Sequence, residues 1–150
     1  MENLVKMLRE GNYSCVIRGR TGVRTFTQRG VADLYELYET QPDWLRGATV
    51  ADKVVGKGAA AIMALAGVKK VYAGVISTPA AGLLRAAGIE VESGCEVPFI
   101  RNRQGTGWCP VETLCRDQDD PAAMLPLIGS FLRQKHGGAA APAGNRNPTD

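Results

Sequence analysis

The stretch TVADKVVGKGAAAIMALAGVKKVYAGVISTPAAGLLRAAGIEVE (residues 49–92) indicates the architecture of the chain. Its first four residues, Thr49-Val-Ala-Asp52, resemble a capping box with Asp in place of the usual Glu, so we predict that a long helix opens there and runs to about residue 66. The body of this helix is apolar nearly all round, which is typical of a buried helix. The pattern then predicts a strand over residues 71–76, a helix over 79–87 and a strand over 89–92. Strand, helix and strand in that order form a parallel pair joined by a right-handed crossover.

The segments on either side add further helices and strands. Two β-prone runs separated by a glycine-containing turn predict a hairpin over residues 13–28. Helical spacing is found over residues 3–10, 31–39 and 121–135, a short helix begins at Pro110, and a further strand is expected over 97–100. The sequence therefore predicts an α/β protein with three layers, α-β-α, around a mixed sheet of four or five strands.

Length and composition favour one domain over residues 1–136, since a chain of 150 residues is long enough to bury a substantial core. The remaining segment, GGAAAPAGNRNPTD (137–150), has no large apolar side chain to offset its ordering entropy, so we predict a disordered tail. The single histidine, His136, stands at the edge of this tail and is a poor candidate for a fixed catalytic group.

Charge and hydropathy narrow the classes of partner. The net charge of +3 is far from the concentrated basic face of a dedicated nucleic-acid binder. The longest uncharged apolar run, residues 58–68, is about half a membrane span, and MENLVKMLRE (1–10) does not read as a secretory signal. We therefore expect a cytoplasmic protein without membrane contact, whose cysteines are reduced, and its self-association into a homo-oligomer stays open.

Three phrases carry a resemblance to a known family: NYSCVIRGRTGVRTFTQRGVADLY (12–35), GATVADKVVGKGAAAIMALAGV (47–68) and RQGTGWCPVETLCRD (103–117). They resemble the family called domain of unknown function 1893, over residues 4–117. The order helix, hairpin, buried helix, strand, helix, strand resembles the cytidine-deaminase-like superfamily. The resemblance implies that fold and no established activity.

Catalytic deaminases of that layout place a His/Cys-x-Glu motif at the start of the buried helix and Pro-Cys-x-x-Cys at the start of the next one, and these residues serve zinc and proton transfer. Here the second motif falls on Ala80 and Leu83, which cannot bind a metal, and residues 52–57 contain neither His nor Cys. The resemblance therefore argues against zinc-dependent deamination, and we expect no metal and no cofactor.

The leading functional hypothesis is a site for a small anionic or nucleotide-like ligand at the N-termini of the two central helices. Lys53 and Lys57 would share one face of the buried helix, and further lining residues would be Ser77, Thr78, Thr106, Gly107 and Trp108. The alternative is that Asp52 caps the helix and both lysines reach solvent. Because Gly56 and Gly58 weaken a helix, another element or a ligand is expected to approach the backbone there.

Two other functions stay open. A metal-independent enzyme or redox protein would use Cys109 as nucleophile, with Glu112 or Asp52 handling protons, although no histidine accompanies the thiol and Glu112 could simply cap its own helical turn. An interaction protein would use the hairpin, where Arg18, Arg20 and Arg24 cluster, or the tail. Arginines at such an edge more commonly prevent strand pairing than bind nucleic acid.

Overall fold

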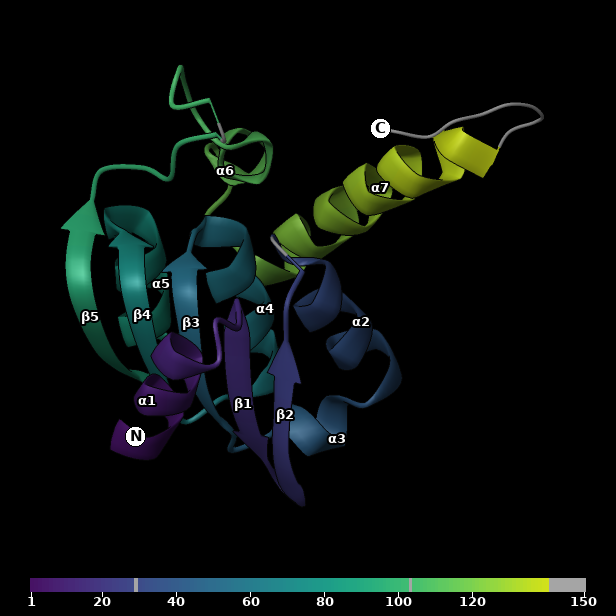
Figure 1. Ribbon diagram of the computed structural model, residues 1–150. Coiled ribbons are helices and arrows are strands. Elements are labelled where there is room, and N and C mark those ends of the chain that lie inside the picture. The colour runs from purple at the N-terminus through teal and green to yellow at the C-terminus, as the bar shows by residue number, and fades with distance from the viewer. Residues whose placement is uncertain (29, 103, 141–150) are drawn as a thin grey trace.

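The computed structural model describes residues 1–28, 30–102 and 104–140, whose strands form one mixed sheet in the order β2-β1-β3-β4-β5 (Figure 1). The strand pairings differ in direction: β3, β4 and β5 are parallel, whereas β1 is antiparallel to both β2 and β3. The strands are β1 (Cys15–Gly19), β2 (Gly22–Phe26), β3 (Thr49–Val55), β4 (Lys70–Ser77) and β5 (Glu90–Val97). The predicted α/β class with a mixed sheet of four or five strands is confirmed.

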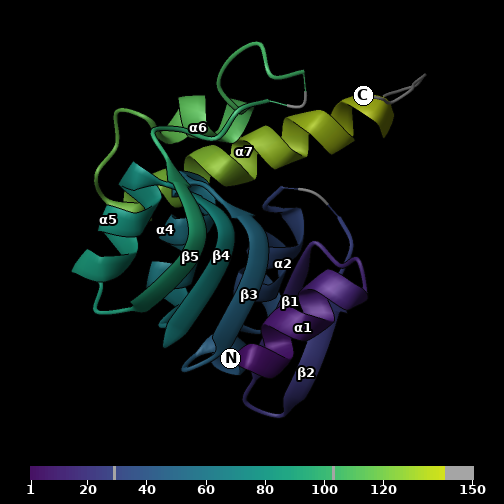
Figure 2. The same cartoon turned by 60° about the vertical axis from the view of Figure 1, so that its left-hand side comes forward.

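Helices cover both faces of this sheet. On one face, α1 (Glu2–Glu10) packs on β1 and β3 through Leu4 and Leu8, which lie one helical turn apart (Figure 2). The opposite face and its main core are covered by α2 (Ala32–Thr40), α3 (Pro42–Leu45), α4 (Lys57–Ala66), α5 (Thr78–Ala86) and α7 (Pro121–Ala140). The short helix α6 (Pro110–Cys115) lies beyond the carboxyl ends of the parallel strands.

The buried helix begins later than the sequence pattern indicated. Residues 49–55 form β3, and α4 starts at Lys57 after Gly56, whose backbone is extended. β3 hydrogen-bonds to β1 on one side and β4 on the other, and this pairing overrides the local helical pattern. The predicted capping box at 49–52 is therefore wrong, and Lys53 and Lys57 do not share a helix face.

The alternation of side chains is interrupted midway along the sheet. Val50 and Val55 of β3 both belong to the main core. In a regular strand, residues 50 and 55 would point to opposite faces of the sheet, because successive side chains alternate. At the interruption, a Cβ on Gly74 would lie 2.7 Å from the carbonyl oxygen of Lys53, and one on Gly94 would lie 3.0 Å from that of Gly74. Glycine at these positions allows the backbones of three adjacent strands to approach closely.

Two further expectations are corrected or limited by the structure. Residues 97–100 do not form a separate strand, because β5 continues to Val97 and the chain leaves the sheet there. Helix α7 reaches Ala140, so residues 137–140 of the predicted disordered tail are helical, whereas residues 141–150 lie outside the described residues. In the part of the chain that is described, no helix combines the length and apolarity needed to cross a membrane.

Candidate ligand-binding site

The N-terminus of α4 is occupied by a carboxylate from α6. Glu112 is 3% exposed; its Oε1 accepts a hydrogen bond from the backbone N–H of Lys57 (2.6 Å) and its Oε2 accepts one from that of Ile100 (2.8 Å). Because the N-cap residue Gly56 has no side chain, Glu112 supplies the acceptor that α4 otherwise lacks. Glu112 therefore caps α4 rather than its own helix. The anion site predicted at this N-terminus is filled by the protein itself.

The two glycines at the start of α4 make room for α6. A Cβ on Gly56 would lie 3.1 Å from Glu112 Oε1, and one on Gly58 would lie 2.4 Å from Cγ1 of Val111. Of the two partners expected near these glycines, another element or a ligand, the structure therefore contains another element.

The G58A variant is expected to lose about 1–3 kcal/mol of unfolding free energy, because the added methyl group overlaps the stiff side chain of Val111. The matched control is G82A in α5, where a Cβ meets nothing within 4 Å; there alanine should stabilise the helix by up to about 1 kcal/mol. Urea denaturation measures both changes. Equal effects of the two substitutions would contradict close packing of α6 on α4.

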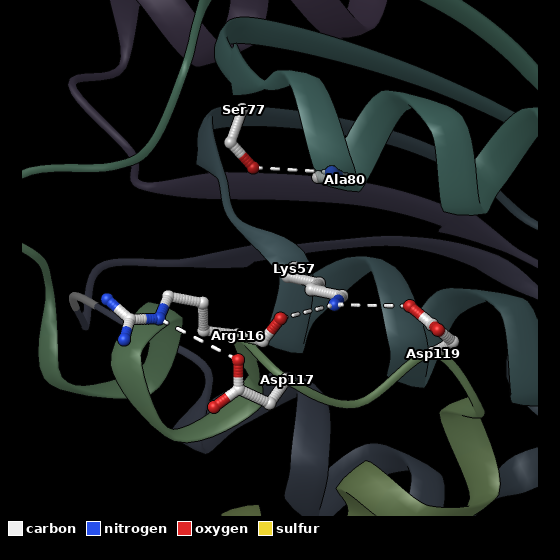
Figure 3. A network of polar contacts seen from close by, with 6 residues as sticks. All are labelled: Lys57, Ser77, Ala80, Arg116, Asp117 and Asp119. Atoms are coloured by element: carbon white, nitrogen blue, oxygen red, sulfur yellow. Dashed lines mark hydrogen bonds and ion pairs between the residues drawn. The ribbon is translucent and has the colours of Figure 1, made fainter.

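The side chain of Lys57 is 9% exposed and runs toward the segment that joins α6 to α7. Its Nζ donates a hydrogen bond to the carbonyl oxygen of Arg116 (3.2 Å) and lies 4.0 Å from Oδ1 of Asp119, whose carboxylate is fully exposed (Figure 3). An ammonium group has three protons to donate, and 4.0 Å is an ion pair rather than a hydrogen bond. The cation is thus only partly compensated by these contacts.

A pocket of about 380 Å³ opens beside Lys57, between α5 and the start of α7. This volume lies in the range of small-molecule sites. Lys57 and Asp119 are the charged residues of its lining, and the other lining residues are apolar or glycine. The lining residues are Lys57, Pro79, Gly82, Leu83, Ala86, Ala87, Asp119 and Pro121.

Several residues predicted for the site do not line this pocket. Lys53 is exposed on β3 and its Nζ donates to Oδ1 of Asn12 (3.1 Å). Ser77 is buried, and its Oγ accepts the backbone N–H of Ala80 (3.3 Å), which caps α5 (Figure 3). The hydroxyl of Thr78 donates to the carbonyl of Val97 (3.3 Å). Their polar atoms therefore serve the protein's own backbone and surface.

The loop before α6 folds on itself. The backbone N–H of Thr106 donates to Oδ1 of Asn102 (3.1 Å), and the carbonyl of Gly107 accepts from the backbone N–H of Asn102 (2.9 Å). The ring of Trp108 stacks on that of Phe99 with centroids 4.5 Å apart, and the guanidinium of Arg116 lies 5.2 Å from the Trp108 centroid. The structure thus brings these residues to one another and not to the pocket.

Asp52 lies in the middle of β3, directly opposite Cys15 of β1. Its Oδ1 accepts a hydrogen bond from the backbone N–H of Val54 (3.2 Å). Burial raises the pKa of Asp52 to about 7, and hydrogen bonds to its carboxylate offset this increase only in part. Burial and the neighbouring Asp52 carboxylate also raise the pKa of the Cys15 thiol well above its ordinary value. Local pattern contained no signal for this pair, which exists only through strand pairing.

Cys109, the candidate nucleophile, is half-buried at the N-cap of α6, with its backbone N–H donating to the carbonyl of Ile100 (2.8 Å). Burial raises the pKa of nearby Cys115 to about 11, and Lys57 offsets this in part. Glu112, the predicted proton carrier, is held by two backbone N–H groups. Within residues 1–28, 30–102 and 104–140, no three His, Cys, Asp or Glu side chains are grouped so as to hold a metal ion.

Comparison with curated proteins finds no match. Among solved structures, a diaminohydroxyphosphoribosylaminopyrimidine deaminase/5-amino-6-(5-phosphoribosylamino)uracil reductase from Thermotoga maritima is similar with a TM-score of 0.42 and 17% identity, over 63% of this chain and 35% of that chain. We draw nothing about activity from a similarity of that size.

A second solved structure is much more similar. It is that of a DUF1893 family protein from Thermotoga maritima, with a TM-score of 0.79 and 27% identity, over 87% of this chain and 91% of that chain. The family model described as "Domain of unknown function (DUF1893)" matches residues 3–132, as the three quoted phrases led us to expect. The protein therefore belongs to the DUF1893 family.

Proposed function

We propose that this protein binds a small molecule with an anionic group and an apolar body in the pocket beside Lys57. The observation that carries the proposal is the buried ammonium of Lys57 in the wall of that pocket. Removing a charge from water costs free energy unless hydrogen bonds replace its hydration. One carbonyl and one distant carboxylate replace it only in part, so an anion entering the pocket would gain a charge-assisted hydrogen bond.

The apolar part of the ligand follows from the remaining walls. Pro79, Leu83 and Ala86 offer carbon surface to whatever occupies the pocket. Burying such surface favours binding by roughly 25 cal/mol for each Å² removed from water. A small polar ion would leave these walls unused, whereas a ring or short chain carrying one anionic group would use both parts of the site.

The K57M variant is expected to weaken binding of 2-naphthoate at least tenfold, because a charge-assisted hydrogen bond contributes about 1.5–3 kcal/mol. Titration followed by the probe's fluorescence measures the affinity. The matched control is K53M, which removes an exposed lysine bonded to Asn12 and should leave the affinity unchanged. Equal affinities of wild type and a natively folded K57M variant, checked by circular dichroism, would contradict the proposed site.

A further inference from the structure

We infer that the ligand is a carboxylate with a single negative charge, and that Asp119 competes with it for Lys57. The inference rests on the proposed function and specifies the ligand's chemistry. Asp119 sits in the wall of the same pocket, with its Oδ1 at 4.0 Å from the ammonium nitrogen of Lys57.

The charges around the pocket suit a monoanion. Lys57 is the one cation among the described lining residues. Asp119 carries a negative charge, which would repel a dianion such as a phosphate ester more strongly than it would repel a monoanion. The backbone N–H groups that commonly bind phosphate are engaged nearby: that of Lys57 donates to Glu112, and that of Ala80 donates to Ser77. A single carboxylate needs no more than the ammonium of Lys57.

Asp119 differs from the two other acids of its segment. Asp117 pairs with Arg116 (3.9 Å), and Asp120 accepts the backbone N–H of Ala122 (3.0 Å) at the start of α7. Asp119 lies near Lys57 without reaching hydrogen-bond distance, and its fully exposed side chain is free to turn into solvent. A ligand carboxylate would replace this loose ion pair with a direct hydrogen bond to the same ammonium group.

The D119N variant is expected to bind 2-naphthoate about three- to tenfold more tightly than wild type, because a weak competing ion pair and a repulsive charge are both removed. D117N is the matched control, since it removes an exposed aspartate paired with Arg116 instead, and its affinity should equal that of wild type. Binding of the neutral 2-naphthamide should not respond to D119N. Wild type should prefer 2-naphthoate to the dianion 2-naphthyl phosphate.

The outcomes separate this inference from the proposed function. If D119N and wild type bind 2-naphthoate equally while K57M loses binding, the pocket stands and the competition is overturned. If 2-naphthyl phosphate binds wild type as tightly as 2-naphthoate, the monoanion is overturned. If K57M binds 2-naphthoate like wild type, the proposed function fails. If 2-naphthoate binds neither wild type nor D119N at millimolar concentration, both the proposed function and this inference fail.

Discussion

Replacing Glu112 with alanine is expected to lower the free energy of unfolding by about 3–5 kcal/mol, the largest effect of any single substitution in the α4–α6 contact. The substitution leaves two backbone N–H groups, those of Lys57 and Ile100, without the carboxylate that accepts from both. Each hydrogen bond to a charged group contributes about 1.5–3 kcal/mol, and a buried donor left without a partner adds its desolvation cost. Urea denaturation followed by circular dichroism measures the loss.

Two further variants isolate the cause. E112Q keeps an amide oxygen for one N–H but turns an NH₂ group toward the other, so a smaller loss of about 1–3 kcal/mol is expected. The matched control is E39A, which removes an exposed glutamate from α2 and should change stability by less than about 0.5 kcal/mol. A loss in E112A no larger than in E39A would mean that Glu112 does not hold α4 and the loop together.

Replacing Asp52 with asparagine is expected to remove a pH dependence of stability. The pKa of Asp52 is raised from 3.8 in the unfolded chain to about 7 in the folded protein, so the folded state binds this proton more tightly. The stabilisation is fully present below about pH 4, is lost progressively as pH rises toward about 7, and is absent above that. At about pH 8, D52N should therefore be more stable than wild type by about 2–4 kcal/mol.

Denaturation midpoints measured from about pH 4 to about pH 8 test this expectation. The difference between wild type and D52N cancels the titration of other carboxylates, including Asp33, whose pKa burial also raises. Asparagine retains an oxygen that can accept the N–H of Val54, so the local backbone should be kept. D117N, which alters an exposed aspartate, should follow wild type at every pH. A D52N curve parallel to that of wild type would contradict a raised pKa of the half-buried Asp52.

The hairpin, the first helix and the β4-α5-β5 unit could be predicted from local sequence because each depends on interactions between near neighbours. The turn at Gly19–Gly22 has glycine at both ends, and Ser77 and Pro79 mark the start of α5 with residues suited to that position. The prediction for residues 49–55 was wrong, because Thr49 and Asp52 have the spacing of a capping box and therefore indicate the start of a helix. The strand conformation of residues 49–55 depends on pairing with β1 and β4, which are separate segments of the chain.

The candidate site, like the fold, could be predicted only in part from local sequence. Composition and the sequence pattern were sufficient to single out Lys57, Glu112 and the glycines at the start of α4, since charges and glycines in an apolar segment are visible without a structure. The partner of each was not visible. That Glu112 caps α4, that Lys57 faces Asp119 and that Asp52 lies beside Cys15 depend on contacts between residues far apart in sequence. Such contacts form only when the sheet and helices pack, because packing alone brings together polar groups that are far apart in the sequence.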